Sequence, residues 1–453
     1  MEILDNKLYN YYLAYQIIDW DIEFSSSIGG KNEKYQLLNQ IDKNIECLLR
    51  QIQNEIEHNI SVCHIDGVFK DEINKRVSNL EVLTDDKEYY DVLDKLEEAF
   101  NSMDSSNRAI LDTINKIKSL IKLRLNRMSI SSGENKYFKF LSTIYSDLDL
   151  DLLFSNIKKL ITLNKKVDYK IRKCNYLDNH IDINMNKIVS KKILKLFGLD
   201  KKVKIIDYKF NSLSLVGNND IRLTLDFNKN INFFMRQIFH ELGHAKYQAT
   251  IKPIKYKILE IPNSLIDDET VGILFEKFIL YNPIIKNQLE NFLELEIDLF
   301  SQFDPSKRIY SPPIKDDIFN IFYVLTEEDL FSNKSITTIK EDFNDRLQEL
   351  NLDINNLNIY ADPHWFYGDF GYYIAYIEAK FRAADIYNNL IKIGIKDTNS
   401  LKKNIEFCFS SISKYLELGK NVNGNIVQYL LSRNTDYNEY FKWLDENKNL
   451  YSK

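Results

Sequence analysis

Apolar residues recur at intervals of three and four over long stretches of the first half of the chain. Residues 88–100 and 108–125 show this spacing most clearly, and it is typical of amphipathic helices. Proline is absent before position 253, and proline is the residue that most readily ends a helix. The pattern therefore predicts an N-terminal helical region over residues 1–200, built from long uninterrupted helices.

The pattern changes near residue 202. Residues 202–210 and 220–227 alternate partly and are rich in β-branched side chains, and Gly217 opens a turn between them, so we expect a small sheet of two or three strands. Helical spacing returns at about residue 231 and continues to the end, interrupted by the prolines. We therefore expect a mainly α fold. Its second region, residues 201–453, begins with the sheet and either forms a separate domain or continues the first region.

Composition excludes several classes of partner. The 453 residues include 66 acidic and 60 basic side chains, and this mild acidic excess argues against nucleic acid as a partner. Every apolar run is shorter than the roughly 20 residues that cross a bilayer, so we expect no membrane association. The N-terminal segment lacks the features of a signal peptide, and the four cysteines form no CxxC pair. Both observations favour a cytoplasmic location.

The segment 239–247 contains the pattern His-Glu-x-x-His, at His240, Glu241 and His244. Residues i and i+4 of a helix lie on one face, so both imidazoles can bind one metal ion. Apolar side chains recur every four positions through this segment, which indicates a half-buried helix. We predict a zinc site here, with Glu241 as the general base that takes a proton from water on the metal.

A zinc hydrolase usually supplies three protein ligands and leaves a fourth position open. Glu269 and Glu276 stand seven residues apart on the next expected helix, so they share a face. Ser264, three residues before Asp267, indicates where this helix begins. We predict Glu269 as the third ligand and Glu276 as the support of a ligating histidine. Asp268 is the alternative third ligand.

Three blocks of the C-terminal half resemble the carboxypeptidase Taq family of zinc metallocarboxypeptidases. Residues 220–248 are similar to the family's Asp-Val-Arg-Ile-Thr strand followed by HEAGHALYEQ, Glu269 and Glu276 fit its next helix, and residues 362–376 are similar to its DVHW-x-x-G-x-FGYFP block. The resemblance implies a mainly α, two-lobed gluzincin fold with a deep central groove and a small β-sheet next to the HExxH helix. The thimet oligopeptidase and oligoendopeptidase F families share part of the pattern and are the second choice.

The late block contains most of the remaining candidate site residues. The resemblance points to His364, Tyr372, Tyr373 and Tyr376 as donors toward the oxyanion of a tetrahedral intermediate. Gly368 and Gly371 are expected to form a loop that approaches the substrate backbone closely, because glycine has no side chain to hold it away.

The strand at 220–227 is a further candidate for substrate binding. A strand edge beside the metal can bind a peptide by strand addition, so we expect this strand to align the substrate. Arg222 then either contacts the substrate or supports the sheet edge. The chain has Asp226 where the family strand carries a second arginine. Arginine is well suited to bind the terminal carboxylate of a peptide. Its absence here argues against strict carboxypeptidase specificity, so an endopeptidase remains an alternative.

The predicted function is zinc-dependent peptide hydrolysis by a broad-specificity carboxypeptidase that releases C-terminal residues. Cobalt or manganese are expected to substitute for zinc, and the resemblance suggests a homodimer. Two alternatives stay open: an oligoendopeptidase that cleaves short peptides internally, and a non-catalytic peptide-binding protein of the same fold. The presence of Glu241 argues against the latter, because a binding protein has no use for a general base.

Overall fold

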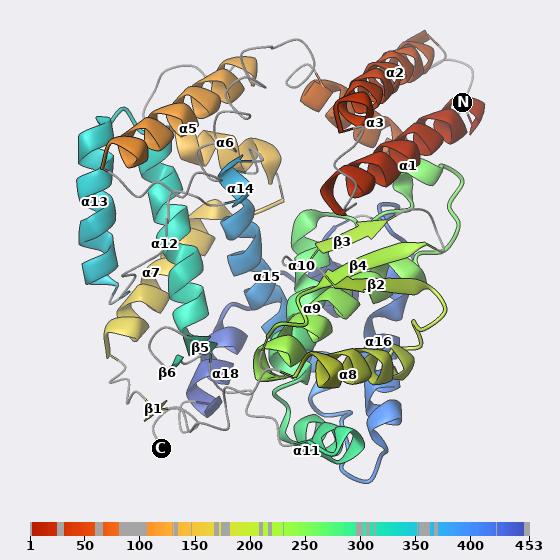
Figure 1. Cartoon of the computed structure of the whole chain (residues 1–453), viewed down its shortest axis with the longest axis vertical. Coiled ribbons are helices and arrows are strands. Elements are labelled where there is room, and N and C mark those ends of the chain that lie inside the picture. Colours follow the sequence, from red (N-terminus) through yellow and green to blue (C-terminus); the bar gives the residue numbers. More distant parts are fainter. Residues whose placement is uncertain are drawn as a thin grey trace. The chain divides into compact units, whose positions relative to one another are not determined.

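The computed structural model describes residues 2–24, 31–58, 67–80, 107–128, 130, 135–145, 147–166, 172–173, 182–207, 212–215, 220–229, 231–295, 302–304, 309–311, 314–350, 352, 363–366, 370–422 and 424–447. Helices dominate this part of the chain, as the apolar spacing predicts (Figure 1). The expected helix at 108–125 is confirmed within α5 (Asn107–Arg127). The expected helix at 88–100 lies outside the described residues. No described helix has both the length and the hydropathy of a membrane span.

The chain divides into two compact units, each assembled from segments that are far apart in the sequence. The first unit consists of Met1–Ser78, Lys170–Pro312 and Ala379–Lys453, and the second of Asn79–Tyr169 and Pro313–Glu378. The last crossing from the second unit to the first occurs within helix α15 (Tyr372–Ile386). The expected division into 1–200 and 201–453 follows the change in sequence pattern and, as a domain boundary, stays a prediction.

The first unit contains most of the helices, including two π-helical segments, η3 and η4. Its helical elements, besides the C-terminal part of α15, are α1 (Glu2–Phe24), α2 (Lys31–His58), α3 (Gly67–Leu80, as far as Ser78), α8 (Ile183–Leu196), α9 (Ile231–Thr250), η2 (Lys257–Leu259), α10 (Leu265–Ile273), η3 (Leu274–Ile279), α11 (Pro283–Leu293), η4 (Tyr387–Ile391), α16 (Leu401–Leu416), α17 (Ile426–Leu431) and α18 (Asn438–Asn447).

A three-stranded sheet precedes α9, as the sequence predicts. Its order is β2 (Val203–Asp207), β4 (Ile221–Leu225), β3 (Ser212–Leu215), with β4 parallel to β2 and antiparallel to β3. The expected strand edge at 220–227 is wrong, because β4 is hydrogen-bonded on both sides and cannot add a peptide strand. A second small sheet has the order β1 (Arg172–Lys173), β6 (Ile309–Ser311), β5 (Gln302–Asp304).

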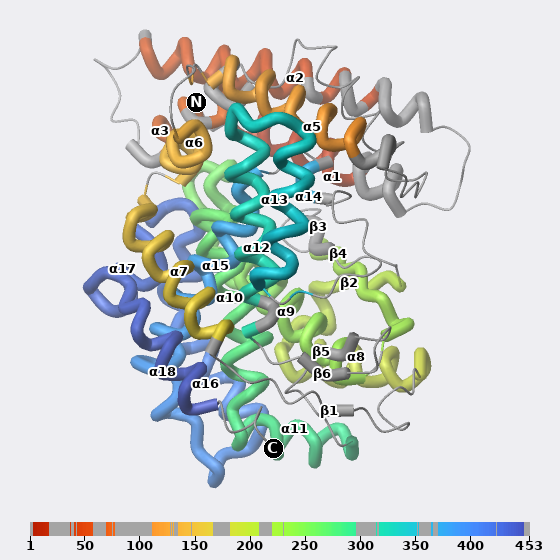
Figure 2. Tube along the Cα trace, turned by 90° about the vertical axis from the view of Figure 1, so that its left-hand side faces the viewer, coloured from red at the N-terminus to blue at the C-terminus, as the bar shows by residue number. Residues whose placement is uncertain are grey.

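The second unit is helical throughout its described residues. Helix α12 runs through it and contacts helices from both of its segments, and Figure 2 shows α12 and α13 side by side. Its core is formed by apolar residues of α12 such as Ile318, Ile321 and Val324, which are fully buried. Its elements, besides the start of α15, are α5, α6 (Lys136–Ile144), α7 (Leu150–Lys166), α12 (Ile314–Phe331), α13 (Ile336–Glu349) and α14 (Pro363–Phe366).

Candidate metal centre

Helix α9 holds the two histidines of the HExxH motif. Its apolar residues Phe234, Ile238 and Leu242 recur every fourth position and are fully buried, so they fix the helix against its neighbours, among them α8, α10 and the sheet. His240 and His244 lie one turn apart on the adjoining face, where their side chains are 14% and 9% exposed. The helical period thus directs both imidazoles to one region, as predicted.

Helix α10 brings a carboxylate to the same region. Its N-cap is Ser264, whose hydroxyl accepts a hydrogen bond from the Asp267 N–H at 3.1 Å, so the predicted helix start is confirmed. The helix packs closely against α9 at two glycines. A Cβ atom on Gly243 would lie 2.9 Å from the Cα of Gly272, which no real pair of residues tolerates. The absence of both side chains therefore lets the two helices come close enough for Glu269 to reach the histidines.

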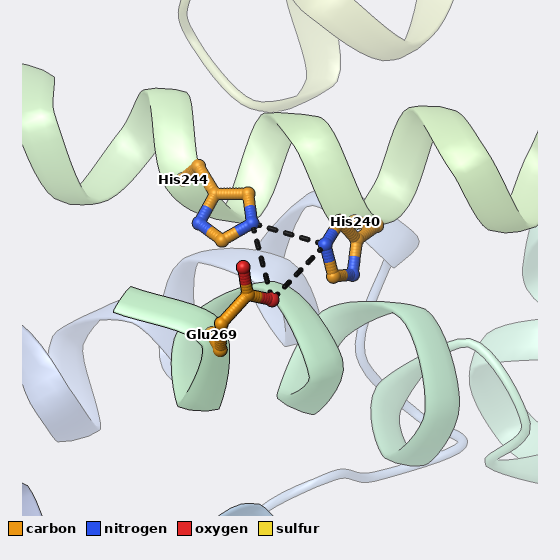
Figure 3. A group of neighbouring side chains, drawn as sticks. All are labelled: His240, His244 and Glu269. Atoms are coloured by element: carbon orange, nitrogen blue, oxygen red, sulfur yellow. Dashed lines mark hydrogen bonds and ion pairs between the residues drawn. The ribbon is translucent and has the colours of Figure 1, made fainter. Parts of the chain in front are cut away.

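Three atoms converge between the helices: the Nε2 atoms of His240 and His244 and the Oε2 atom of Glu269 (Figure 3). Their separations are 3.0 Å between the two nitrogens, 3.4 Å from His240 to Glu269 and 3.8 Å from His244 to Glu269. Donors bound about 2.0–2.1 Å from one tetrahedral ion lie about 3.3–3.4 Å from one another, and these three separations average 3.4 Å. The three predicted ligands therefore fit a tetrahedral ion with one open position.

A carboxylate stands behind each imidazole. Glu276 Oε2 lies 3.0 Å from His240 Nδ1, and Asp268 Oδ1 lies 3.0 Å from His244 Nδ1. Arg236 in turn donates to Glu276 from Nη2 at 2.7 Å. The hydrogen bond between Glu276 and His240 fixes the tautomer and leaves Nε2 free for a metal, whereas Asp268 and His244 form an ion pair. Asp268, the alternative third ligand, faces the wrong nitrogen to join the converging atoms, and its place behind His244 was not foreseen.

The buried charges of the centre perturb one another. For His240 and His244, burial alone would lower the pKa, but the facing carboxylates outweigh it: the pKa of His240 lies well above its ordinary value and that of His244 rises to about 9. Burial raises the pKa of Glu241, opposed by the two histidines. The pKa of Glu276 lies far below its usual range despite burial, because Arg236 and His240 hold its charged form.

Comparisons with known proteins identify the family. The family model described as carboxypeptidase Taq (M32) metallopeptidase matches residues 7–265, which is more than half of the chain and includes both histidines. The chain belongs to the carboxypeptidase Taq family. The family and the enzyme class predicted from the sequence, a metallocarboxypeptidase, are thereby confirmed. A search among curated protein sequences found no significant match.

Solved structures share the carboxypeptidase Taq fold. A carboxypeptidase from Pyrococcus furiosus is 15% identical, with a TM-score of 0.79 over 98% of this chain and 97% of that one. An M32 carboxypeptidase from Deinococcus radiodurans is 10% identical, with a TM-score of 0.80 over 100% and 99%. A Bacillus anthracis structure assigned to oligoendopeptidase F, 10% identical, reaches a TM-score of 0.52 over 99% and 96%. The predicted fold class is confirmed, and the second-choice family is the more distant one.

The late carboxypeptidase Taq block forms an aromatic cluster in the second unit. His364 of α14 stacks on Tyr372 of α15, with ring centroids 4.0 Å apart and planes 15° apart. Tyr372 also contacts Tyr376, and Tyr373 stacks on Tyr323 of α12 at 4.4 Å. The structure thus brings all four candidate donors together, and their action on a substrate stays a prediction.

A buried glutamate on α12 anchors this block and was missed by the sequence analysis. Glu327 is fully buried and accepts hydrogen bonds from Tyr137 at 2.6 Å, from the Trp365 indole at 2.8 Å and from the Gly371 N–H at 2.9 Å. Gly371 has φ +82°, and a Cβ there would come within 2.9 Å of Ile144. These contacts account for a glycine at 371 without a substrate, so its contact with substrate stays a prediction.

Arg222, the remaining candidate, lies on the central strand β4. Its guanidinium pairs with Asp220 at 3.2 Å, and across the sheet it is in register with Lys204 and Ser214. Asp220 also pairs with Lys204 at 3.0 Å. These contacts fit the expected support of the sheet better than a substrate contact, which stays a prediction.

Metal affinity is expected to depend on pH through His244. Below a pKa of about 9 the metal-free protein holds this imidazole protonated, and a metal must displace that proton. The pKa of His240 also lies well above its ordinary value, so this imidazole carries a second proton to displace, and zinc affinity should rise by at least about tenfold per pH unit between pH 7 and 8. Calorimetry in two buffers of different ionisation enthalpy counts the protons released per zinc. We expect at least one at pH 7.5, and finding none would contradict this electrostatic account.

Proposed function

We propose that this metallocarboxypeptidase uses zinc, held by His240, His244 and Glu269, to release C-terminal residues from peptides with broad specificity. The observation that supports the proposal is the convergence of two Nε2 atoms and one carboxylate oxygen at separations of 3.0–3.8 Å. Each imidazole has a carboxylate on its other nitrogen, which is the arrangement that supports neutral histidine ligands.

Zinc bound there would lower the pKa of a water molecule and polarise the scissile carbonyl. The protein's part begins with Glu241, which follows His240 on α9 and accepts the proton of the attacking water at its carboxylate. Burial raises its pKa toward working pH, which suits a group that must take up a proton and then deliver it to the leaving amine.

The tetrahedral intermediate needs hydrogen-bond donors at its developing oxyanion. We assign this role to the cluster of His364, Tyr372, Tyr373 and Tyr376, whose imidazole N–H and phenol O–H groups donate without a fixed charge. Stacking of His364 on Tyr372 at 4.0 Å restricts both rings, which keeps such donors preorganised.

A pair of peptides tests the proposed exopeptidase activity. One is an unblocked peptide of about ten residues, and the other has the same sequence with a C-terminal amide. Mass spectrometry should show successive loss of C-terminal residues from the unblocked peptide only. A chelator should stop the reaction, and zinc, or cobalt or manganese as substitutes, should restore it. Internal fragments from both peptides would indicate the oligoendopeptidase instead, and a zinc-loaded protein that cleaves neither would indicate a binding protein.

The proposal includes peptides as substrates, and Arg222 is a weaker candidate for holding them. A homodimer and a cytoplasmic location stay predictions from the sequence. Sedimentation of the purified protein would decide the first.

A further inference from the structure

We propose that Asp267 is a positioning residue of the metal centre. Through Arg382 and Tyr415 it fixes the first turn of α10, so that the next two residues, Asp268 and Glu269, reach the imidazoles. This inference rests on the proposed function, because it concerns how the proposed zinc ligand Glu269 is held.

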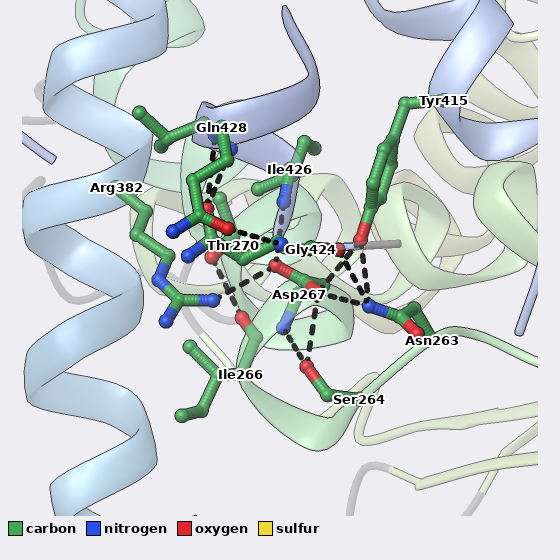
Figure 4. Close-up of polar contacts among 12 residues, drawn as sticks. Asn263, Ser264, Ile266, Asp267, Thr270, Arg382, Tyr415, Gly424, Ile426 and Gln428 are labelled. Atoms are coloured by element: carbon green, nitrogen blue, oxygen red, sulfur yellow. Dashed lines mark hydrogen bonds and ion pairs between the residues drawn. The ribbon is translucent and has the colours of Figure 1, made fainter. Parts of the chain in front are cut away.

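Asp267 collects five hydrogen bonds on one carboxylate (Figure 4). All five partners are donors, and two come from the chain just before it while three come from α15, α16 and the start of α17. A carboxylate is an acceptor-only group, so an aspartate satisfies every partner at once. The donors are Arg382 Nη1 at 3.0 Å and the Ile426 N–H at 3.2 Å on Oδ1, and the Tyr415 hydroxyl at 2.7 Å, Asn263 Nδ2 at 3.0 Å and the Ser264 hydroxyl at 3.0 Å on Oδ2.

The network is rigid because it is buried and charged. Asp267 is fully buried and Arg382 is 1% exposed. Neither charged group can therefore be solvated by water if its partner moves away. Breaking a buried pair of this kind leaves an uncompensated charge. The first turn of α10 is a helix end, where fraying is ordinarily easiest. Here hydrogen bonds tie this turn to α15, α16 and the start of α17.

Helix geometry turns this anchor into a positioning device. Consecutive residues of a helix point about 100° apart. With Asp267 held toward α15, α16 and α17, Asp268 reaches His244 Nδ1 at 3.0 Å. Glu269 then reaches the Nε2 atoms of His240 and His244 at 3.4 and 3.8 Å. A rotation of this turn would displace both carboxylates together.

The acidic residues of this segment fall into two groups, those that pair with an arginine and those that face an imidazole. Arg382 pairs with Asp267 at 3.0 Å, and Arg236 pairs with Glu276 at 2.7 Å. Asp268 and Glu269, which lie between these two carboxylates in the sequence, both face imidazoles. The second arginine-bound carboxylate, Glu276, supports His240 from the other nitrogen.

The test compares two variants with matched controls. Asp267→Asn puts an amide NH₂ among the donors, and Tyr415→Phe removes one donor with no change in packing volume beyond the hydroxyl. The controls are Asp151→Asn, an exposed first-turn aspartate of α7, and Tyr429→Phe, a partly exposed tyrosine whose ring packs beside that of Tyr415 but makes none of the five hydrogen bonds. The readouts are zinc affinity, measured by competition with a chromogenic chelator, and the visible absorption of the cobalt-loaded protein, which reports ligand geometry. Thermal melting of the metal-free form is measured beside them.

We expect zinc affinity to fall about tenfold for Asp267→Asn and about threefold for Tyr415→Phe, with an altered cobalt spectrum, as for other residues that orient ligands. Both controls should stay within twofold of the wild type. Unchanged affinity and spectrum in Tyr415→Phe, with only a lower melting temperature, would reduce the network to a structural brace and overturn the inference; this variant decides if Asp267→Asn does not fold. If the His240→Ala variant still binds zinc as the wild type does, the proposed site itself is overturned, and the inference with it.

Discussion

Replacing Glu241 with glutamine is expected to stop peptide hydrolysis while leaving the metal bound. Glu241 lies on α9 beside the ligands, but its carboxylate is not among the three converging atoms. Its pKa is raised by burial, so it can accept a proton from water and return it to the leaving amine. Glutamine has nearly the same shape but cannot take up that proton. We expect kcat to fall by about 10³-fold, measured by release of the C-terminal residue from an unblocked peptide.

Two further variants distinguish the loss of the general base from the loss of zinc and from the loss of an unrelated carboxylate. Glu269→Gln removes a ligand charge and should lower zinc content together with activity, whereas Glu241→Gln should retain about one zinc per chain by elemental analysis. Glu290→Gln, on α11 and outside the centre, controls for the loss of one carboxylate. If Glu241→Gln keeps more than a tenth of wild-type activity at full zinc content, another group is the base.

The sequence predicted those parts of the centre that depend on local periodicity. His240 and His244 share a face because the helix repeats every 3.6 residues, and the buried apolar positions of α9 show which face that is. Ser264 marks the start of α10 because its hydroxyl completes the first turn. Glu269 follows from the need for a third ligand on the next helix.

Contacts between distant segments could not be predicted in this way. Asp267 and Glu327 each look like ordinary acidic residues on a helix, yet each collects its donors from elements that are far away in the sequence. The order of the sheet is equally nonlocal. An alternating segment such as 220–227 has the same sequence pattern in an edge strand as in a central strand of a sheet. The structure shows that β4 is the central strand, paired with both neighbours, and not the expected edge strand.

The π-helical segment η3 shows a third kind of limit. It begins at Leu274, between Glu269 and Glu276, and single π turns inside helices often occur at functional sites. The two glutamates still approach opposite nitrogens of His240, at 3.4 and 3.0 Å. The seven-residue spacing predicted this shared face, but it carried no signal for the wider turn.

Replacing Gly272 with alanine is expected to lower zinc affinity by about 100-fold with little effect on folding. A Cβ at this position would lie 2.8 Å from His244 Nε2 and 3.0 Å from His240 Cε1. In the metal-free protein the imidazoles can turn away from the new methyl group. Alanine also favours a helix interior over glycine by up to about 1 kcal/mol, so the free energy of unfolding should stay within about 1 kcal/mol of the wild-type value. Bound zinc fixes both rings, and the contact can then no longer be relieved.

Two other glycines separate this local effect from general damage. Gly243→Ala sets a methyl group against the backbone of α10, 2.9 Å from Val271 O and Gly272 Cα, so it should destabilise the metal-free fold as well. Gly198→Ala meets no atom within 4 Å but has φ +67°, so it should cost stability without changing zinc affinity. Chelator competition and urea unfolding of the metal-free proteins measure both quantities. If Gly272→Ala binds zinc within twofold of the wild type, the close approach of α10 to the imidazoles is not what sets the geometry of the metal centre.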